Sequence, residues 1–274
     1  MKLQAIIAYT FREGLARKTI ITFAAISTFF LLIGILVAIL APDTITMPAQ
    51  NAQGQQQNVP IGSMREVTMG IQAFLTWTIF GIAIYFSVFA TASILPNMME
   101  KGSIDLLLSK PVRRGTILLG STIGATLIVA ANVSYFVVGM WVISGLRTGF
   151  WNWGFLAIIL PITFGFVVLY APMMAMSIAS RSSALSIIVV YAYALVLGPI
   201  LEARDMIAEM ADKPVVGTVL DFLYYPLPKV DGLSKLANAL VMHQPFSWEP
   251  VWTSALFAAA LFALAWWQFS RKNF

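Results

Sequence analysis

Six long apolar segments constrain this chain more than any other feature of its sequence. Crossing a bilayer takes roughly 20 predominantly apolar residues, and each segment is about that long or longer. None contains Asp, Glu, Lys, Arg or His, and only 11% of the chain is charged, against about 25% in soluble domains. The sequence therefore predicts an all-α integral membrane protein with six transmembrane helices. The predicted spans are Thr19–Ala41, Ile71–Leu95, Thr116–Ser144, Gly154–Ile178, Ala184–Leu201 and Val251–Phe269.

The distribution of basic residues predicts which side of the membrane each loop faces. An even number of spans places both termini on one side. Eleven of the 17 Lys and Arg residues would lie on that side, although its loops are the shorter ones. Because short cytoplasmic loops are enriched in Lys and Arg, we expect both termini in the cytosol. The same rule accounts for the net charge of +5 without a nucleic-acid partner.

An amphipathic segment precedes the first span. In residues 2–18 the apolar side chains fall on one half of a helical wheel, whereas Arg12 and Glu13 fall on the other. This pattern is typical of a helix that lies in the membrane interface, here on the cytoplasmic side. The alternative is a cytosolic extension of the first span.

Two longer segments are predicted on the outer side of the membrane. The first contains Ala49–Asn58, a polar low-complexity run that cannot bury a hydrophobic core. The second, residues 202–250, joins an acidic helical piece, Glu202–Ala211, to the apolar pieces Val215–Tyr225 and Leu233–Met242. These apolar pieces are too short to span, so we expect outer re-entrant or interfacial helices.

The loop after the second span is a short apolar helix enclosed by charged residues. Ser103 can cap its N-terminus and Pro111 ends it. Ile104, Leu107 and Leu108 share one helix face at i, i+3 and i+4. An apolar face presented to the cytosol predicts contact with a cytosolic partner. The alternative is that these side chains fold back on the chain's own spans.

The sequence predicts no catalytic residue in this chain. The absence of cysteine excludes disulfides and thiolate chemistry. Spans without ionisable residues argue against an ion-coupled carrier, because proton and ion relays in membranes use such residues. Gly115–Thr122 imitates a phosphate-binding loop, but Ser121 stands where that loop requires lysine. If this protein moves a substrate uphill, we expect the energy to come from another chain.

Metal binding is not predicted either. His243 is the only histidine, and a metal site needs several ligands, so we interpret it as a solvent-exposed or capping residue. Met173, Met174 and Met176 are soft-metal ligands in principle, but methionines at such positions more often pack irregular cores.

Polar and small residues in the third span suggest contacts between helices. Gly120 and Gly124 form a G-x-x-x-G pattern, which predicts close helix packing within the subunit or across a dimer. Thr126, Asn132 and Ser134 are candidates for the lining of a transport pathway. The alternative is that they form hydrogen bonds to a neighbouring helix.

The loop after the second span carries a resemblance to a known family. Residues 100–114 resemble the pattern E-x-G-T-x-x-x-L-L-x-x-P-x-x-R of the permease subunits of ABC exporters in the second ABC permease superfamily, which have the type V exporter fold. Ser103 replaces the usual threonine. In that family the segment is the coupling helix, which lies in a cleft of a separate ATPase subunit. The implied ATPase-contact residues are Glu100, Gly102, Ser103, Ile104, Leu107, Leu108, Pro111, Arg113 and Arg114.

The resemblance implies an architecture and a function. Residues 1–274 would form a single transmembrane permease domain, with a cytoplasmic coupling-helix loop at residues 97–115. Two copies of the permease would assemble with two ATPase subunits, which bind ATP and Mg, while this chain holds no cofactor. The expected function is ATP-driven export across a prokaryotic plasma membrane (the bacterial inner membrane), amid membrane lipid. The alternative is an ATPase-driven scaffold or mechanotransmitter that supports an outer partner without moving a substrate.

Overall fold

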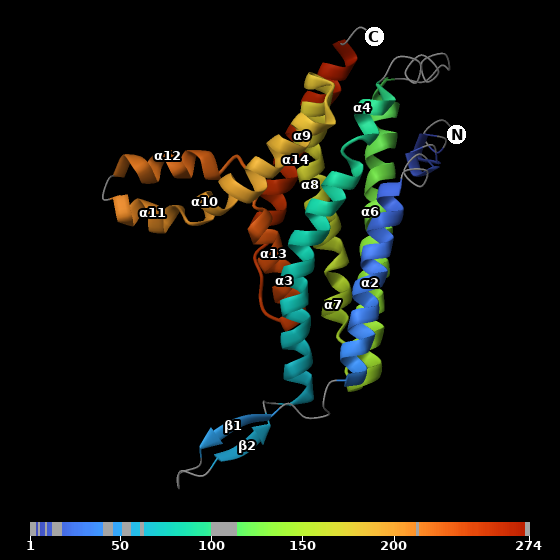
Figure 1. Cartoon of the computed structure of the whole chain (residues 1–274). Helices are drawn as coiled ribbons and strands as arrows, with labels where there is room; N and C mark the ends of the chain where they lie inside the picture. Colours follow the sequence, from blue (N-terminus) through green and yellow to red (C-terminus); the bar gives the residue numbers. More distant parts are fainter. Residues whose placement is uncertain are drawn as a thin grey trace.

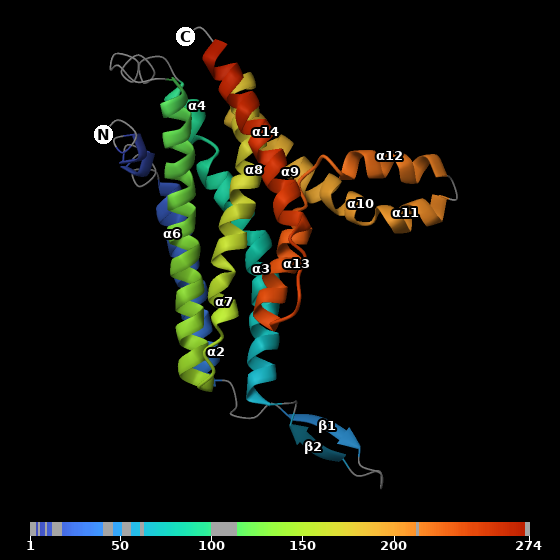
Figure 2. The same cartoon turned by 180° about the vertical axis from the view of Figure 1, so that it is seen from behind.

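The computed structural model describes residues 4, 6–8, 10–12, 18–40, 46–50, 56–60, 63–99, 114–211 and 214–271. It is a bundle of long helices in which the N-terminal helix, α4, the start of α6 and the end of α14 lie at one end (Figures 1 and 2). Six helical segments in the described residues are long and apolar enough to cross a membrane, which confirms the six predicted spans.

The spans are built from long helices and a few short ones that extend them. They are α2 (Lys18–Leu40), α3 (Met64–Thr91) with α4 (Ile94–Met98), α6 (Arg114–Thr148), α7 (Trp153–Ala157) with α8 (Ile159–Ser180), α9 (Ser183–Ala192) with the π-helix η1 (Tyr193–Leu197) and α10 (Gly198–Glu202), and α14 (Glu249–Arg271). Three more helices connect the fifth span to the sixth, namely α11 (Arg204–Ala211), α12 (Pro214–Tyr224) and α13 (Val230–Met242).

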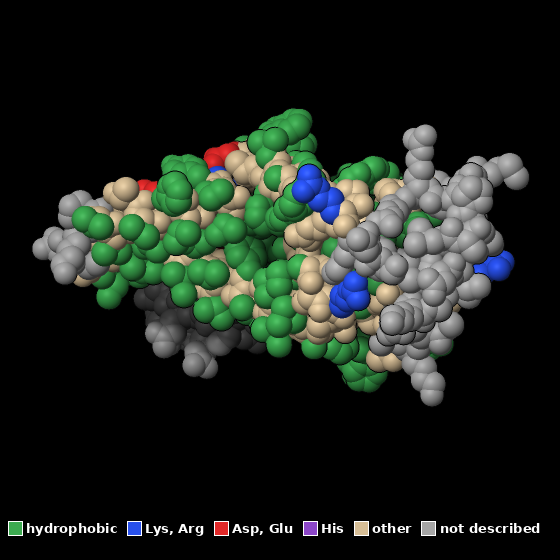
Figure 3. All heavy atoms as spheres, turned by 90° about the horizontal axis from the view of Figure 1, so that it is seen from above, with side chains coloured by type: hydrophobic (Ala, Val, Ile, Leu, Met, Phe, Trp, Pro, Cys, Tyr) green, Lys and Arg blue, Asp and Glu red, His purple; other side chains and the backbone are tan. Residues whose placement is uncertain are grey.

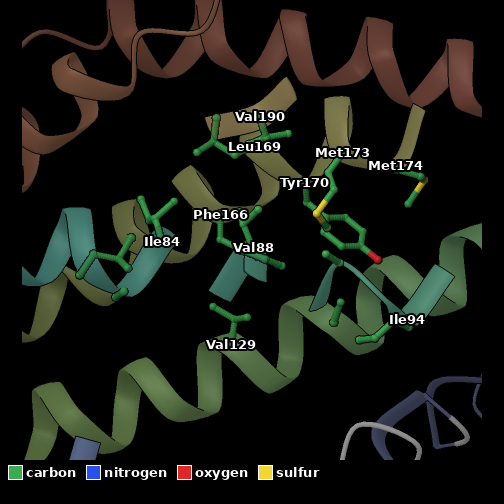
Figure 4. Packing of buried hydrophobic residues seen from close by; sticks show 14 of the residues in the cluster. Ile84, Val88, Ile94, Val129, Phe166, Leu169, Tyr170, Met173, Met174 and Val190 are labelled. Atoms are coloured by element: carbon green, nitrogen blue, oxygen red, sulfur yellow. The ribbon is translucent and has the colours of Figure 1, made fainter. Parts of the chain in front are cut away.

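The core of the bundle forms around α8, which packs against α3, α6, α9, α13 and α14. Figure 4 shows Phe166 and Tyr170 of α8 close to Val88 of α3, with Val129 of α6 nearby. These side chains are at most 1% exposed. Met173 also lies in this core at 2% exposure, so the methionines of the fourth span that the structure buries serve packing, as methionine's flexible side chain allows.

The outer surface of the bundle is apolar, as lipid contact requires. On α2, Leu36, Ile39 and Leu40 are more than half exposed. A soluble protein rarely exposes such a continuous apolar surface, so this face is built for lipid. α2 packs mainly on α6, where Gly139 leaves room for the side chain of Leu31.

The fifth span contains an irregular turn. α9 passes into the π-helix η1 before α10, which has Pro199 in its first turn. Proline lacks an N–H, and its ring clashes with the carbonyl four residues earlier. The wider π turn directly precedes the turn that holds Pro199, and the helix continues past this proline to Glu202.

The two apolar pieces between the fifth and sixth spans take different positions. α11 and α12 form a helical hairpin that projects sideways from the bundle (Figures 1 and 2), which we call the arm. In contrast, α13 packs within the bundle against α3, α7 and α8. Leu233, Ala237 and Val241 are 0% exposed, because they repeat at helical spacing along the face that meets these helices.

A short β-hairpin lies between the first two spans, where the sequence suggested only a polar low-complexity run. β1 (Thr46–Gln50) and β2 (Gln56–Pro60) pair antiparallel, with Thr46 opposite Pro60 and Gln50 opposite Gln56. Main-chain hydrogen bonds need no apolar side chains, so a polar sequence can pair in this way. The hairpin lies at the end of the bundle opposite α4 (Figure 1).

Candidate functional site

The predicted ATPase contact lies almost wholly outside the described residues. This applies to Glu100, Gly102, Ser103, Ile104, Leu107, Leu108, Pro111 and Arg113, while Arg114 is the first residue of α6. Their role as a coupling helix therefore stays a prediction. The structure describes the two anchors between which this segment runs.

Both anchors are fixed in the helical core. On one side, Met98 and Met99 are 1% and 7% exposed. On the other side, Gly115 lies against the indole ring of Trp266 from α14, where a Cβ atom would collide with the ring. Ile117, one turn on, is 1% exposed. The loop therefore begins and ends at rigid points.

The N-terminal helix packs beside this end of α6. Residues 6–8 and 10–12 are helical, in agreement with the predicted helix, and Ile6 is 5% exposed. Thr10 is 0% exposed and lies against Gly124, where an added Cβ would come within 2.7 Å of the threonine Cβ. Gly124 thus packs closely, as the G-x-x-x-G pattern predicts for it, and its partner is the N-terminal helix.

The end of the bundle that carries the two anchors is basic in the part that the structure describes. Arg12 is the last described residue of the N-terminal helix, and Arg181 is the C-cap of α8. Arg271 is the last residue of α14. Figure 3, a view onto this end, shows blue side chains over the bundle and red side chains over the arm. A basic end next to the membrane has the charge expected of a cytoplasmic face.

The three candidate pathway residues do not share one face of α6. Asn132 points to α2 and accepts a hydrogen bond from Ser27 Oγ at 2.9 Å. At 3.6 residues per turn, Ser134 lies about 160° around the helix from Asn132. Thr126 donates its hydroxyl to the Thr122 carbonyl at 2.8 Å. Asn132 lines a niche of about 420 Å³ between α2, α6 and the N-terminal helix. The pathway role of the three residues stays a prediction.

A larger cavity, of about 780 Å³, lies between α3, the end of the fifth span, α12 and α13. Its walls include the aromatic side chains of Trp77, Phe80, Tyr85, Tyr193 and Tyr224. The sequence did not predict this site, because the lining residues come from four elements that are distant along the chain. A charged residue directly after an apolar span, such as Glu202, was the one signal available.

Ion pairs hold the root of the arm beside this cavity. Arg204 contacts Asp221 at 3.0 Å and so links α11 to α12, with its guanidinium 3.7 Å from the centre of the Tyr224 ring. Lys229, which is 4% exposed, pairs with Glu249 at the start of α14. Burial of these cations is tolerated because each has a carboxylate partner.

Lys235 of α13 joins two acids at the same place. Its ammonium lies 2.6 Å from Asp231 and 3.4 Å from Glu202. The hydrogen bond to Asp231 raises the pKa of Lys235, against the opposing effect of burial. The lysine is therefore a cation at neutral pH, and it neutralises one of the two carboxylates.

A buried polar network ties the opposite end of the bundle together. The Asn152 amide nitrogen donates to Gln72 Oε1 at 2.8 Å and to the Val241 carbonyl at 3.0 Å. Gln72 in turn donates to Ser144 Oγ at 2.9 Å. This network joins α3, α6 and α13 at the N-cap of α7. Its buried polar groups are paired with one another, so it stabilises the packing instead of weakening it.

The remaining histidine and metal candidates have structural explanations. His243 is the exposed C-cap of α13, in the left-handed conformation with φ 54°. This agrees with a capping or solvent-exposed role. Within the part of the chain that the structure describes, no group of three or more His, Cys, Asp or Glu side chains has the arrangement of a metal site.

Together these features define a helical membrane protein with six candidate spans and, in the residues that the structure describes, one basic end. The chain matches the family model described as ABC-2 family transporter protein over residues 5–274, and it belongs to this family. The match confirms the family that the sequence resembles, and the role of the loop after the second span stays a prediction. A search of curated proteins finds no match.

Proposed function

We propose that this chain is the permease subunit of an ATP-driven exporter, with ATP and Mg bound by a separate ATPase. The observation that carries the proposal is the family match over residues 5–274. The E-x-G-S-x-x-x-L-L-x-x-P-x-x-R sequence at residues 100–114 supports it, because it lies between two anchors at the basic end of the bundle. We propose that this sequence contacts the ATPase.

The charges of the bundle support a machine that is driven from outside the chain. Among the described residues, the buried charged side chain is Lys229, and it lies between α12 and α13 with Glu249 as its partner. Secondary carriers place ionisable groups at the membrane midplane. The cavity beside the fifth span, in turn, favours transport over a purely mechanical role, since its volume suits an organic molecule.

We further propose that two copies of the chain form the transport unit in the plasma membrane of a prokaryote. Closed two-fold assemblies are the commonest oligomers, and six spans without an ion-coupling residue suit half of such a unit. Co-purification of differently tagged copies tests the homodimer.

The purified chain alone is expected to show no ATP hydrolysis and no gradient-driven uptake in vesicles. Its energy source would lie on the ATPase, so activity should appear only when the ATPase is reconstituted with it. Phosphate release and flux under an imposed proton gradient measure the two activities. Proton-driven flux through the isolated chain would contradict the proposal and favour a secondary carrier.

The cytoplasmic orientation of the basic end predicts a labelling pattern in intact cells. Because the chain has no cysteine, single replacements can be labelled without background. Gln56→Cys and Val215→Cys should react with an impermeant maleimide from outside, whereas Ser109→Cys should react only after the cells are opened. Labelling of Ser109→Cys in intact cells would reverse the orientation.

A further inference from the structure

The cavity beside the fifth span combines an aromatic wall with acidic residues. The charged residues among its lining are Glu202, from the end of the fifth span, and Asp231, from the first turn of α13. The neighbouring cations Arg204, Lys229 and Lys235 are not part of the lining. A molecule inside the cavity therefore faces carboxylates and aromatic rings.

Each nearby cation has an acidic partner, and the net charge of the ionic side chains around the cavity remains negative. Arg204 pairs with Asp221 and Asp205, and Lys229 pairs with Glu249. That leaves Lys235 as the cation between the two lining carboxylates. One ammonium cannot neutralise two carboxylates, so one negative charge is available to a ligand.

The aromatic rings are held in place by hydrogen bonds to the backbone. The Tyr85 hydroxyl donates to the Ala194 carbonyl at 3.3 Å, and the Tyr193 hydroxyl donates to the Pro228 carbonyl. Both acceptor positions adjoin irregular backbone, at the π-helix η1 and at the turn before α13. π-Helical turns occur frequently at functional sites. Here the turn carries Tyr193 into the cavity wall.

The volume and the position of the cavity define the size and polarity of its ligand. A cavity of about 780 Å³ lies within the range of sites for drug-sized molecules. Trp77, in its wall, is 64% exposed, so the cavity is accessible from the apolar surface of the bundle. A ligand that enters from lipid needs an apolar body.

We propose that this cavity binds an organic cation with an apolar body and one positive charge. The positive charge would be bound by the carboxylates of Glu202 and Asp231 and by the aromatic rings of the wall, which are those of Trp77, Phe80, Tyr85 and Tyr193. Aromatic faces attract such cations, and the carboxylate attraction is stronger near a membrane than in bulk water. The inference rests on the proposed function only where it makes the ligand a transported substrate. Binding itself needs no ATPase.

Two ions of the same shape and opposite charge test the proposal. Tetraphenylphosphonium and tetraphenylborate differ in the sign of their charge while their four phenyl groups are alike. We expect the purified permease in detergent to bind the phosphonium saturably, and the borate about tenfold or more weakly, as measured by calorimetry. Equal affinity for the two ions would overturn the proposal, since it would show a merely apolar cavity.

Substitutions assign the charge to the named residues. The Glu202→Gln, Asp231→Asn double variant should lose about tenfold in phosphonium affinity. Glu209→Gln is the matched control, because Glu209 is an exposed acid of the arm that does not line the cavity. It should bind as the unmodified protein does. Equal losses in the control and in the double variant would contradict the assignment.

The Lys235→Met substitution tests the charge assignment with a gain of affinity, which poor folding could not produce. Because Lys235 competes for both carboxylates, its removal should strengthen phosphonium binding about threefold or more. Unchanged or weaker binding would contradict the charge balance described above. Failure of this binding leaves the ATPase dependence of the permease intact, and failure of ATPase assembly leaves the binding intact, so the two proposals are tested separately.

Competition identifies the source of the cation. Tetrapentylammonium represents a free organic cation, and a short-chain phosphatidylcholine represents a lipid headgroup. Displacement of the phosphonium by either compound supports a cation site and identifies the source. Displacement by neither would overturn the proposal.

Discussion

Replacing Leu107 and Leu108 together by Asp is expected to release the ATPase from the permease. The two leucines form the apolar face of the predicted coupling helix, and a carboxylate in an apolar interface stays uncompensated. Interface residues of this kind cost about 2 kcal/mol or more each when disrupted, so binding should weaken on the order of 1000-fold. Co-purification and permease-dependent ATP hydrolysis measure the effect.

A matched variant separates the face of the helix from the added charge. Leu106 and Ser109 lie in the same loop, but helical spacing places them away from Ile104, Leu107 and Leu108. The Leu106→Asp, Ser109→Asp variant should therefore keep much more of the ATPase. Full co-purification and full hydrolysis with the Leu107→Asp, Leu108→Asp variant would refute the predicted contact.

Gly154→Ala is expected to cause the largest loss of stability in the described part of the chain. A Cβ atom at Gly154 would overlap the carbonyl oxygen of Leu240, and this oxygen belongs to the backbone of α13. The helices cannot separate without disturbing the Asn152 network beside them. Overpacking of this kind costs about 1–3 kcal/mol, or roughly 2–12 °C in melting temperature at about 2–4 °C per kcal/mol for a large chain.

Gly70→Ala is the control for this substitution. Nothing lies within 4 Å of a Cβ built at Gly70, which is in the interior of α3. Alanine is the better helix former by about 1 kcal/mol, so this variant should melt at the same temperature or higher. Tryptophan fluorescence during heating in detergent reports both. A stable Gly154→Ala protein would show that α7 and α13 are less closely packed than described.

The sequence was sufficient to predict the spans, because each depends on local composition alone. The length of an apolar run decides whether it crosses a bilayer, and the structure adds only a few residues at the ends. The N-terminal helix was predictable for the same reason, since Ile6 and Arg12 fall on different halves of the helical wheel by spacing alone. The partner of Gly124 was not predictable, because nothing near that glycine in the sequence indicates a contact with Thr10.

The parts that could not be predicted depend on contacts between distant residues. α12 and α13 are both short and apolar, yet Phe222 is 79% exposed and Val241 is 0% exposed. The difference arises because α13 meets α3, α7 and α8, and no local pattern specifies these neighbours. The cavity was unpredictable for the same reason, since Tyr85 and Tyr193 come together only when the fifth span packs on the second.

The fixed ends of the loop at residues 100–113 determine how a mechanical load would pass into the bundle. One end continues from Met99, and the other enters α6 against Trp266. A force applied to residues 100–113 would therefore reach the bundle through buried residues on both sides of this segment. Gly115 belongs to α6 and packs against Trp266 of α14, so a force at this end of the segment acts on the third and sixth spans together.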